Sequence, residues 1–183
     1  RRDDWKPYVM HTVNYGKSWK NMAENKQIQG YALSITQDPG ESSLLFLGTE
    51  FGLYFSLDYG KKWTRWTNGF PNVSTMDLKI HPREKDLIIG TFGRAAYIID
   101  DITPLSLLAH EGKTMLDKSL KVFPAQEAFL AFIKEAEGIR FAANGDFIGE
   151  NRPFGASISF YLKELTKEDD KTDTVHITIS SES

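Results

Sequence analysis

The sequence predicts an all-β fold made of repeated four-stranded antiparallel sheets, and three observations lead to this prediction. Apolar runs of four or five residues are separated by turn residues along residues 7–104. A hairpin motif occurs twice, 44 residues apart, and a strand-and-loop pattern recurs at an offset of 42 residues. A period in the forties with one small antiparallel sheet per unit is typical of the blades of a β-propeller.

The clearer copy of the hairpin motif spans residues 56–63. An apolar run ending at Ser56 leads into a turn formed by Asp58 and Gly60, and Trp63 lies in the strand 62–66 that leads out. An aspartate side chain accepts hydrogen bonds from backbone N–H groups about two residues further on, and glycine adopts the positive φ that other residues avoid. The tryptophan ring covers the turn with a large apolar surface. We therefore predict that these four residues brace a hairpin.

The second copy lies earlier, at residues 12–19, with Thr12, Asn14, Gly16 and Trp19 in the same register. The two copies resemble the Asp-box of the bacterial neuraminidase (BNR) repeat, whose pattern is S/T-x-D-x-G-x-x-W. The copy with Asp58 matches this pattern in full, and the copy with Asn14 departs from it at the acidic position. Because asparagine keeps the turn-forming geometry, the same bracing role is predicted for both copies.

Three repeat units are predicted within residues 1–104. Their strands are expected at residues 7–12 and 19–22 in the first unit, at 32–36, 44–47, 52–56 and 62–66 in the second, and at 76–80 and 87–91 in the third. The inner strands of the first unit are expected upstream of residue 1. The third unit keeps an aspartate at position 100 but lacks the glycine and tryptophan of the motif, so the regular repeat is predicted to end there.

The end of the third unit carries a second and more specific resemblance. The run Gly-Thr-Phe-Gly-Arg at residues 90–94, followed by Tyr-Ile-Ile-Asp-Asp-Ile-Thr-Pro-Leu at 97–105, is similar to the last blade of sortilin-like and xyloglucanase-like bacterial propellers. This resemblance covers residues 7–125. It implies that the segment holds the C-terminal blades of a larger, extracytoplasmic bacterial protein. It also implies that its partners are the remaining blades, from the same or another chain.

Residues 105–150 are predicted to form a connector that contains a last outer strand near residues 120–123. For residues 125–134, helix propensity favours a helix and the family resemblance favours an extended segment, and both interpretations stay open. The connector is rich in glycine from residue 138 onward, which predicts irregular structure there.

Residues 151–183 are predicted to begin a β-sandwich domain, an expectation that comes from the family resemblance of residues 149–155. Residues 156–163 read as a strand, and residues 175–179 read as its antiparallel partner. Because a lone hairpin is marginally stable in water, this one is expected to pack on something or to belong to a truncated sandwich.

Composition and charge exclude several classes of partner and site. Twenty-two basic against 25 acidic residues give a formal charge of −3, too balanced to indicate nucleic acid or an anionic membrane as a partner. Cysteine is absent, which excludes disulfides, thiolate metal sites and cysteine nucleophiles. The sequence contains no apolar run long enough to span a bilayer. It begins without an initiating methionine or a signal region, so we expect a piece of a longer protein.

The repeat topology separates two ends of each predicted sheet. In a four-stranded blade the Asp-box lies between the third and outermost strands, whereas ligands usually bind at the opposite end, on the loops between second and third strands. This places Glu50 and Phe51, together with Phe92 and Arg94, on the ligand face. A carboxylate and a guanidinium from adjacent loops could meet there and contact a sugar or a peptide terminus. The alternative is an ordinary salt bridge between loops.

No catalytic residue, metal site or cofactor is predicted. A glycosidase needs two carboxylates about 5–5.5 Å or 6.5–9.5 Å apart, and the acidic residues do not form an obvious pair on the ligand face. The consecutive Asp100 and Asp101 are interpreted as a cap of the turn before Pro104. The four histidines are scattered without the spacing of metal ligands.

These observations favour a non-catalytic module of a larger protein that binds a protein, a peptide or a glycan. The alternative is part of a xyloglucanase- or sialidase-like glycoside hydrolase whose catalytic carboxylates lie outside this segment. A third hypothesis is a scaffold domain that makes protein contacts within a larger assembly. Fold analogy does not decide among them, because function must be argued from a site.

Overall fold

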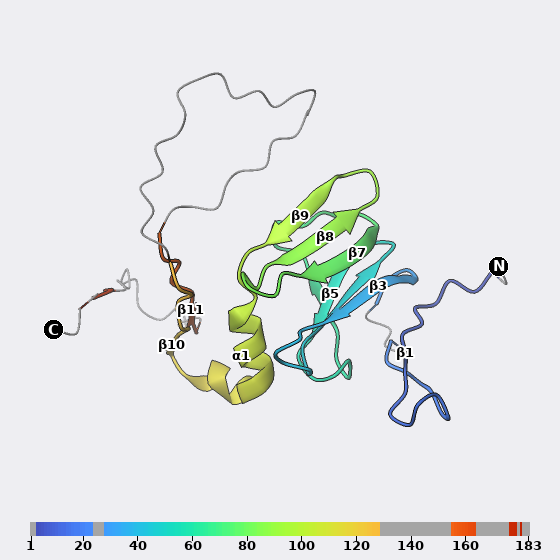
Figure 1. The fold of residues 1–183 in the computed structure, drawn as a ribbon, viewed down its shortest axis with the longest axis horizontal. Helices are drawn as coiled ribbons and strands as arrows, with labels where there is room; N and C mark the ends of the chain where they lie inside the picture. Colours follow the sequence, from blue (N-terminus) through green and yellow to red (C-terminus); the bar gives the residue numbers. More distant parts are fainter. Residues whose placement is uncertain (1–2, 24–27, 129–154, 164–175, 179, 181–183) are drawn as a thin grey trace, which may run out of the picture.

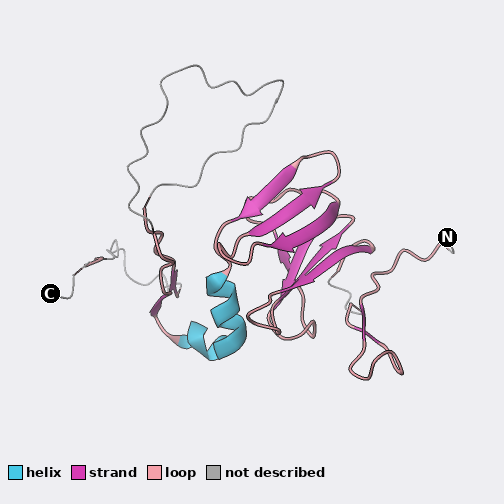
Figure 2. Ribbon diagram, viewed as in Figure 1, coloured by secondary structure: helices cyan, strands magenta, loops and turns pink. Residues whose placement is uncertain are grey.

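The computed structural model describes residues 3–23, 28–128, 155–163, 176–178 and 180, which form a mostly β structure with several antiparallel sheets (Figures 1 and 2). The strands are β1 (Met10–His11), β2 (Lys20–Asn21), β3 (Ala32–Gln37), β4 (Leu45–Thr49), β5 (Gly52–Ser56), β6 (Thr64–Trp66), β7 (Thr75–Ile80), β8 (Leu87–Thr91), β9 (Ala96–Ile99), β10 (Leu120–Val122) and β11 (Phe160–Leu162). Helix α1 (Thr103–Glu111) and the 3-10 helix η1 (Lys113–Asp117) follow β9. The mostly β structure agrees with the predicted all-β class. The sheets formed by β1 to β9 lie side by side without closing into a ring, and the β10-β11 pair lies apart from them, beyond α1.

The central sheet has four antiparallel strands in the order β3-β4-β5-β6. Pairing of Leu47 with Tyr54 and of Phe46 with Phe55 sets the register of its two middle strands. Successive side chains of a strand point to opposite faces, and both faces of this sheet are covered by other parts of the chain. That double burial explains why residues 44–47 are wholly apolar and do not alternate with polar residues.

The next sheet has three antiparallel strands in the order β7-β8-β9 and packs beside the central sheet along β3 and β4. A four-stranded unit is thus present in the central sheet, whereas this unit has three strands among the described residues. The difference arises because the chain turns into α1 after β9 instead of returning as a fourth strand. On the other side of the central sheet lies the short pair β1-β2, in which Met10 pairs with Asn21.

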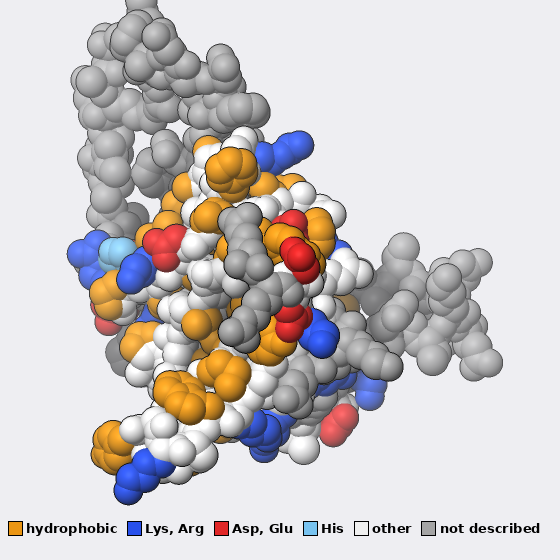
Figure 3. Space-filling view, turned by 90° about the vertical axis from the view of Figure 1, so that its right-hand side faces the viewer, with side chains coloured by type: hydrophobic (Ala, Val, Ile, Leu, Met, Phe, Trp, Pro, Cys, Tyr) orange, Lys and Arg blue, Asp and Glu red, His pale blue; other side chains and the backbone are white. Residues whose placement is uncertain are grey.

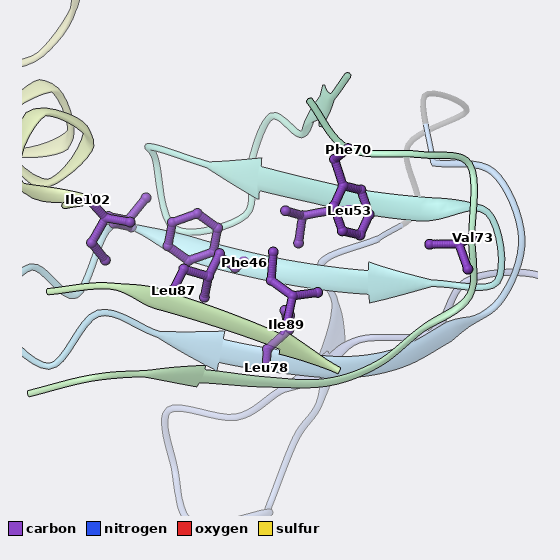
Figure 4. Packing of buried hydrophobic residues seen from close by; sticks show 9 residues of the cluster. Phe46, Leu53, Phe70, Val73, Leu78, Leu87, Ile89 and Ile102 are labelled. Carbon is purple, nitrogen blue, oxygen red and sulfur yellow. The ribbon is translucent and has the colours of Figure 1, made fainter. Parts of the chain in front are cut away.

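Two hydrophobic clusters hold these sheets together, one on each face of the central sheet. The first joins the central sheet to the three-stranded sheet and to the start of α1, and Figure 4 shows its side chains interdigitating between the strands. Its fully or nearly fully buried members are Leu44, Phe46, Leu53, Phe70, Val73, Leu78, Leu87, Ile89 and Ile102. The second joins the central sheet to the β1-β2 pair and consists of Val9, Ala23, Ile28, Leu45, Leu47, Tyr54 and Trp63.

Helix α1 occupies a region that the sequence predicts as part of a connector. Pro104 stands in its first turn and Gly112 follows its last residue, which are common start and stop signals. Asp101 Oδ1 accepts a hydrogen bond from the Thr103 N–H at 3.1 Å in the turn before the proline, while the N-cap residue of the helix, Ile102, makes no side-chain cap bond. The helix is held to the central sheet by Ser106, whose hydroxyl donates to the buried Asp38 carboxylate at 2.5 Å.

The C-terminal part of the described chain differs from its prediction in one pairing. A strand is present at residues 120–122, but it pairs antiparallel with β11, with Leu120 opposite Leu162. Residues 156–163 therefore contribute a strand whose partner is β10, not residues 175–179 as the sequence indicates; of the latter, residues 176–178 are described and are not in a strand. Residues 125–128 are neither helix nor strand, and residues 129–134 lie outside the described part.

The described residues contain no helix that is both long and apolar enough to span a bilayer.

Candidate ligand-binding site

The turn at residues 56–63 is closed by its own side chains. The Ser56 hydroxyl accepts hydrogen bonds from the N–H groups of Asp58, at 3.3 Å, and Gly60, at 2.9 Å, and donates to Asp58 Oδ1 at 2.8 Å. Asp58 Oδ1 also accepts the Lys62 N–H at 2.8 Å. Tyr59 and Gly60 both have positive φ, 57° and 75°. The carboxylate is therefore used to fix the turn.

The turn at residues 12–19 has the same hydrogen bonds with different side chains. The Thr12 hydroxyl accepts the Gly16 N–H at 2.9 Å, and Asn14 Oδ1 accepts the Ser18 N–H at 2.9 Å. The asparagine also donates from its Nδ2 to Ser18 Oγ at 2.8 Å, where an aspartate could only accept. An amide oxygen thus replaces the carboxylate oxygen without loss of the turn.

This equivalence leads to a testable prediction at Asp58. Asp58→Asn is expected to change the free energy of unfolding by less than about 0.5 kcal/mol, because the amide oxygen can accept the same two hydrogen bonds. Asp58→Ala removes both bonds and is expected to cost about 1–2 kcal/mol. Urea denaturation followed by circular dichroism measures both values. An asparagine variant as unstable as the alanine variant would show that the negative charge itself is required.

The two turns differ in what covers their tryptophans. Trp63 is 2% exposed, and its Nε1 donates to the Met22 carbonyl oxygen at 2.9 Å, so the end of the β1-β2 pair covers it. A Cβ added to Gly60 would lie 2.6 Å from Met22 Cε, which shows how closely the pair approaches the turn. Trp19 is 57% exposed. The same motif is therefore buried between sheets in one copy and open on one side in the other.

The four predicted ligand-face residues lie in two loops at the opposite end of the sheets from these turns. Glu50 and Phe51 form the β4–β5 turn, and Phe92 and Arg94 lie in the β8–β9 loop. Ser74 connects the loops, since its hydroxyl donates to the Glu50 carbonyl at 2.9 Å and its own carbonyl accepts the Phe92 N–H at 2.9 Å.

The side chains of Glu50 and Arg94 do not meet. None of the ion pairs between described residues includes either of them. Arg94 is exposed, and Phe92 is 75% exposed. The loops are thus brought together through the backbone near Ser74, and the salt bridge considered from the sequence is not formed.

Arg65 organises the same end of the central sheet, and the sequence did not single it out. Its Nη2 donates to the Phe51 carbonyl at 2.8 Å and to Asn72 Oδ1 at 3.2 Å, and its Nη1 donates to Gln29 Oε1 at 3.5 Å. One guanidinium therefore ties the β4–β5 turn to both neighbouring connections. The sequence clue to this role was that Arg65 lies on the strand that leads from the 56–63 turn toward the loop end.

A cavity of about 460 Å³ opens at this loop end, between the N-terminal segment, the start of β3 and the β4–β5 turn. The aromatic residues Trp5, Tyr8 and Tyr31 form part of its wall. The carboxylates of Asp3, Asp4 and Glu50 line it as well, together with Lys6 and Ala32. Figure 3 looks at the end of the molecule where the N-terminal segment lies and shows acidic and hydrophobic side chains next to one another on that face. We call this cavity the acidic–aromatic pocket.

Hydrogen bonds set the charge state of one wall of the acidic–aromatic pocket. The Tyr8 hydroxyl donates to Asp4 Oδ2 at 2.6 Å, and the Lys6 N–H donates to Asp4 Oδ1 at 3.2 Å. These two bonds, the tyrosine bond first, lower the pKa of Asp4, and the same carboxylate raises the pKa of Tyr8. Asp4 thus stays ionised to lower pH than a free aspartate, and Tyr8 stays protonated.

A second cavity, of about 370 Å³, lies at the other end of the sheet beside the 56–63 turn. There Ser43 Oγ donates to Glu41 Oε1 at 2.6 Å, and Glu41 Oε2 lies 3.0 Å from His110 Nδ1. The hydrogen bonds from Ser43 are the main cause of the lowered pKa of Glu41. The glutamate stands between the other two residues, so the imidazole does not reach the hydroxyl as it does in a Ser-His-acid triad. We interpret the trio as a contact that fastens α1 to the β3–β4 turn.

The described residues contain no group of three or more His, Asp or Glu side chains arranged to hold a metal ion.

No family model, curated protein or solved structure matches the chain in comparisons with known proteins.

Proposed function

We propose that the chain is a non-catalytic binding module, part of an Asp-box β-propeller of the sortilin-like or xyloglucanase-like type, and that its ligand is a protein, a peptide or a glycan. The observation that carries the binding role is the acidic–aromatic pocket at the loop end of the central sheet. Concave sites with aromatic walls and a few polar groups are the usual form of ligand sites. An extracytoplasmic location belongs to the same proposal and rests on the sequence resemblance.

The arrangement of the sheets supports the propeller part of the proposal. The central sheet is covered on both faces by neighbouring sheets of the same chain, as a blade within a propeller is. Trp63 is buried against the preceding unit, whereas Trp19 presents the equivalent surface with 57% of its area exposed. We propose that further blades, from the same or another chain, cover Trp19 in the way that Met22 covers Trp63.

The contacts of the acidic residues favour binding over glycoside hydrolysis within the described residues. Asp58 is engaged with its own turn, and Asp38 accepts hydrogen bonds from Ser106 and from the Gly40 N–H. A general acid must carry a proton at the working pH. The hydrogen bond from Tyr8 lowers the pKa of Asp4 and keeps it ionised, so Asp4 is poorly suited to that role. These carboxylates hold structure or present negative charge.

Binding of the full chain to peptide and glycan arrays tests the proposal. Trp5→Ala is expected to weaken binding of any captured ligand by about tenfold, because it removes the most exposed aromatic surface of the acidic–aromatic pocket. Tyr15→Ala is the control, since Tyr15 is fully exposed in the 12–19 turn and does not line the pocket. Equal losses in the two variants, or no loss in Trp5→Ala, would contradict a binding role for this pocket.

A further inference from the structure

We propose that the acidic–aromatic pocket recognises a cationic side chain of a peptide, preferably the guanidinium group of arginine. This inference rests on the proposed binding function and names the chemical class of its ligand. Three features of the pocket support it: the sign of its charge, the excess of hydrogen-bond acceptors on its wall, and the exposed aromatic faces beside them.

The described residues that line the pocket carry an excess of negative charge. Asp3, Asp4 and Glu50 contribute three carboxylates, and Lys6 contributes one ammonium group. The bonds from Tyr8 and from the Lys6 N–H hold Asp4 in its ionised form. A cation entering the pocket therefore meets a negative potential, and charge-assisted hydrogen bonds to carboxylates are stronger than neutral ones.

The wall of the pocket offers mainly acceptors. The carboxylates accept hydrogen bonds, and the Tyr8 hydroxyl can act only as an acceptor toward a ligand because its hydrogen is donated to Asp4. A guanidinium group has five N–H donors and no acceptor, so it complements such a wall. A neutral sugar hydroxyl both donates and accepts hydrogen bonds, and among the charged residues that line the pocket Lys6 alone could donate to it. A sugar therefore complements this wall less well than a guanidinium group does.

The aromatic residues suit the flat face of the same group. Trp5 and Tyr31 form a tilted ring pair with centroids 5.6 Å apart, and Trp5 remains 56% exposed. An arginine placed over an exposed tryptophan gains a cation–π interaction, and its aliphatic stem covers apolar ring surface. Tyr8 is 51% exposed and adds a second ring within the pocket.

The Glu50 carboxylate is carried on a fixed piece of backbone. Its N–H donates to the Tyr31 carbonyl at 3.2 Å, and its carbonyl accepts the Ser74 hydroxyl at 2.9 Å. A Cβ added to Gly30 would lie 2.9 Å from the Glu50 Cβ, so the turn is closely packed on the segment before β3. Little conformational freedom of the main chain is therefore lost when Glu50 engages a ligand.

Titration of the full chain with two blocked peptides tests this inference. Acetyl-Gly-Arg-Gly-amide carries the guanidinium group, and acetyl-Gly-citrulline-Gly-amide has nearly the same shape without the charge. We expect the arginine peptide to bind at least about tenfold more tightly, in NMR or calorimetric titrations at low salt. Asp4→Asn and Glu50→Gln are each expected to remove most of that preference, while Asp100→Asn, an exposed carboxylate at the end of β9, leaves it unchanged.

The outcomes separate this inference from the proposed function. Equal affinity for both peptides, with both weakened by Trp5→Ala, would overturn the choice of a cationic ligand and leave a binding pocket. Binding that is unaffected by Trp5→Ala, Asp4→Asn and Glu50→Gln would overturn both. Circular dichroism of each variant checks that the fold is retained, as expected for these partly exposed positions.

Discussion

Replacing Trp63 with alanine is expected to lower the free energy of unfolding by about 3–5 kcal/mol, whereas Trp19→Ala is expected to cost no more than about 1 kcal/mol. The two residues occupy the same position of the same turn motif. Trp63 is 2% exposed and packs between the central sheet and the β1-β2 pair, so its removal leaves a cavity. Trp19 is 57% exposed and packs over Gly16.

Urea denaturation of the full chain and of both variants measures this difference. Trp63→Phe separates packing from hydrogen bonding, since it keeps a ring but loses the bond from Nε1 to the Met22 carbonyl. That variant is expected to lie between the parent chain and the alanine variant, with about 1 kcal/mol attributable to the hydrogen bond. Equal costs for Trp63→Ala and Trp19→Ala would show that Trp19 is also covered in solution. That result would favour an additional sheet packed on the β1-β2 pair.

The four strands of the central sheet, and β7 and β8 of the three-stranded sheet, could be predicted from sequence because their signals are local. Alternation in residues 77–80 and the apolar run before Gly48 reflect the burial of strand faces. Met76, predicted to share a face with Leu78 and Ile80, is instead 47% exposed, next to a register shift between Thr75 and Asp77. The turns at 12–19 and 56–63 could be predicted because each is closed by hydrogen bonds between residues at most four positions apart. Local chemistry of this kind is independent of the rest of the fold.

The features that could not be predicted depend on contacts between distant parts of the chain. β10 pairs with β11, about forty residues away, and the alternation of Leu120 and Val122 does not specify which strand lies opposite. Helix α1 had local signals in Pro104 and Gly112, but its attachment through Ser106 to Asp38 spans 68 residues. The sequence predicts a connector there because residues 105–120 mix polar and apolar side chains.

In the candidate site, too, the residues with a local sequence signal could be predicted, and those that depend on contacts between distant parts of the chain could not. Glu50 was selected because repeat topology places the β4–β5 turn at the loop end. Trp5 and Tyr8 were not selected, because their role follows from the way the N-terminal segment folds across β3 to reach Tyr31. Arg65 was missed for a related reason, since its partners lie in three different connections.

Gly48→Ala is expected to destabilise the fold by about 1–3 kcal/mol or more, because the added methyl group has no room between two sheets. A Cβ at this position of β4 would overlap Ser34 Oγ and would lie 2.5 Å from the Thr75 carbonyl oxygen and 2.7 Å from Thr75 Cγ2. The carbonyl belongs to the backbone of β7, and Ser34 Oγ donates to it at 3.2 Å. Relief of the overlap therefore requires the two sheets to move apart.

Gly90→Ala is the matched control, because Gly90 holds the equivalent position one repeat later, in β8. Its added Cβ would meet no atom closer than 3.6 Å, the distance to Asp77 Cβ, which is ordinary van der Waals contact. We expect Gly90→Ala to leave the stability unchanged or to raise it by up to about 1 kcal/mol, since alanine reduces the conformational entropy of the unfolded chain. Urea denaturation of the two variants gives the comparison. A Gly48→Ala variant as stable as Gly90→Ala would mean that β4 and β7 do not approach as closely as the structure has them. The side-by-side packing of the repeat units, on which the proposed propeller depends, would then be wrong.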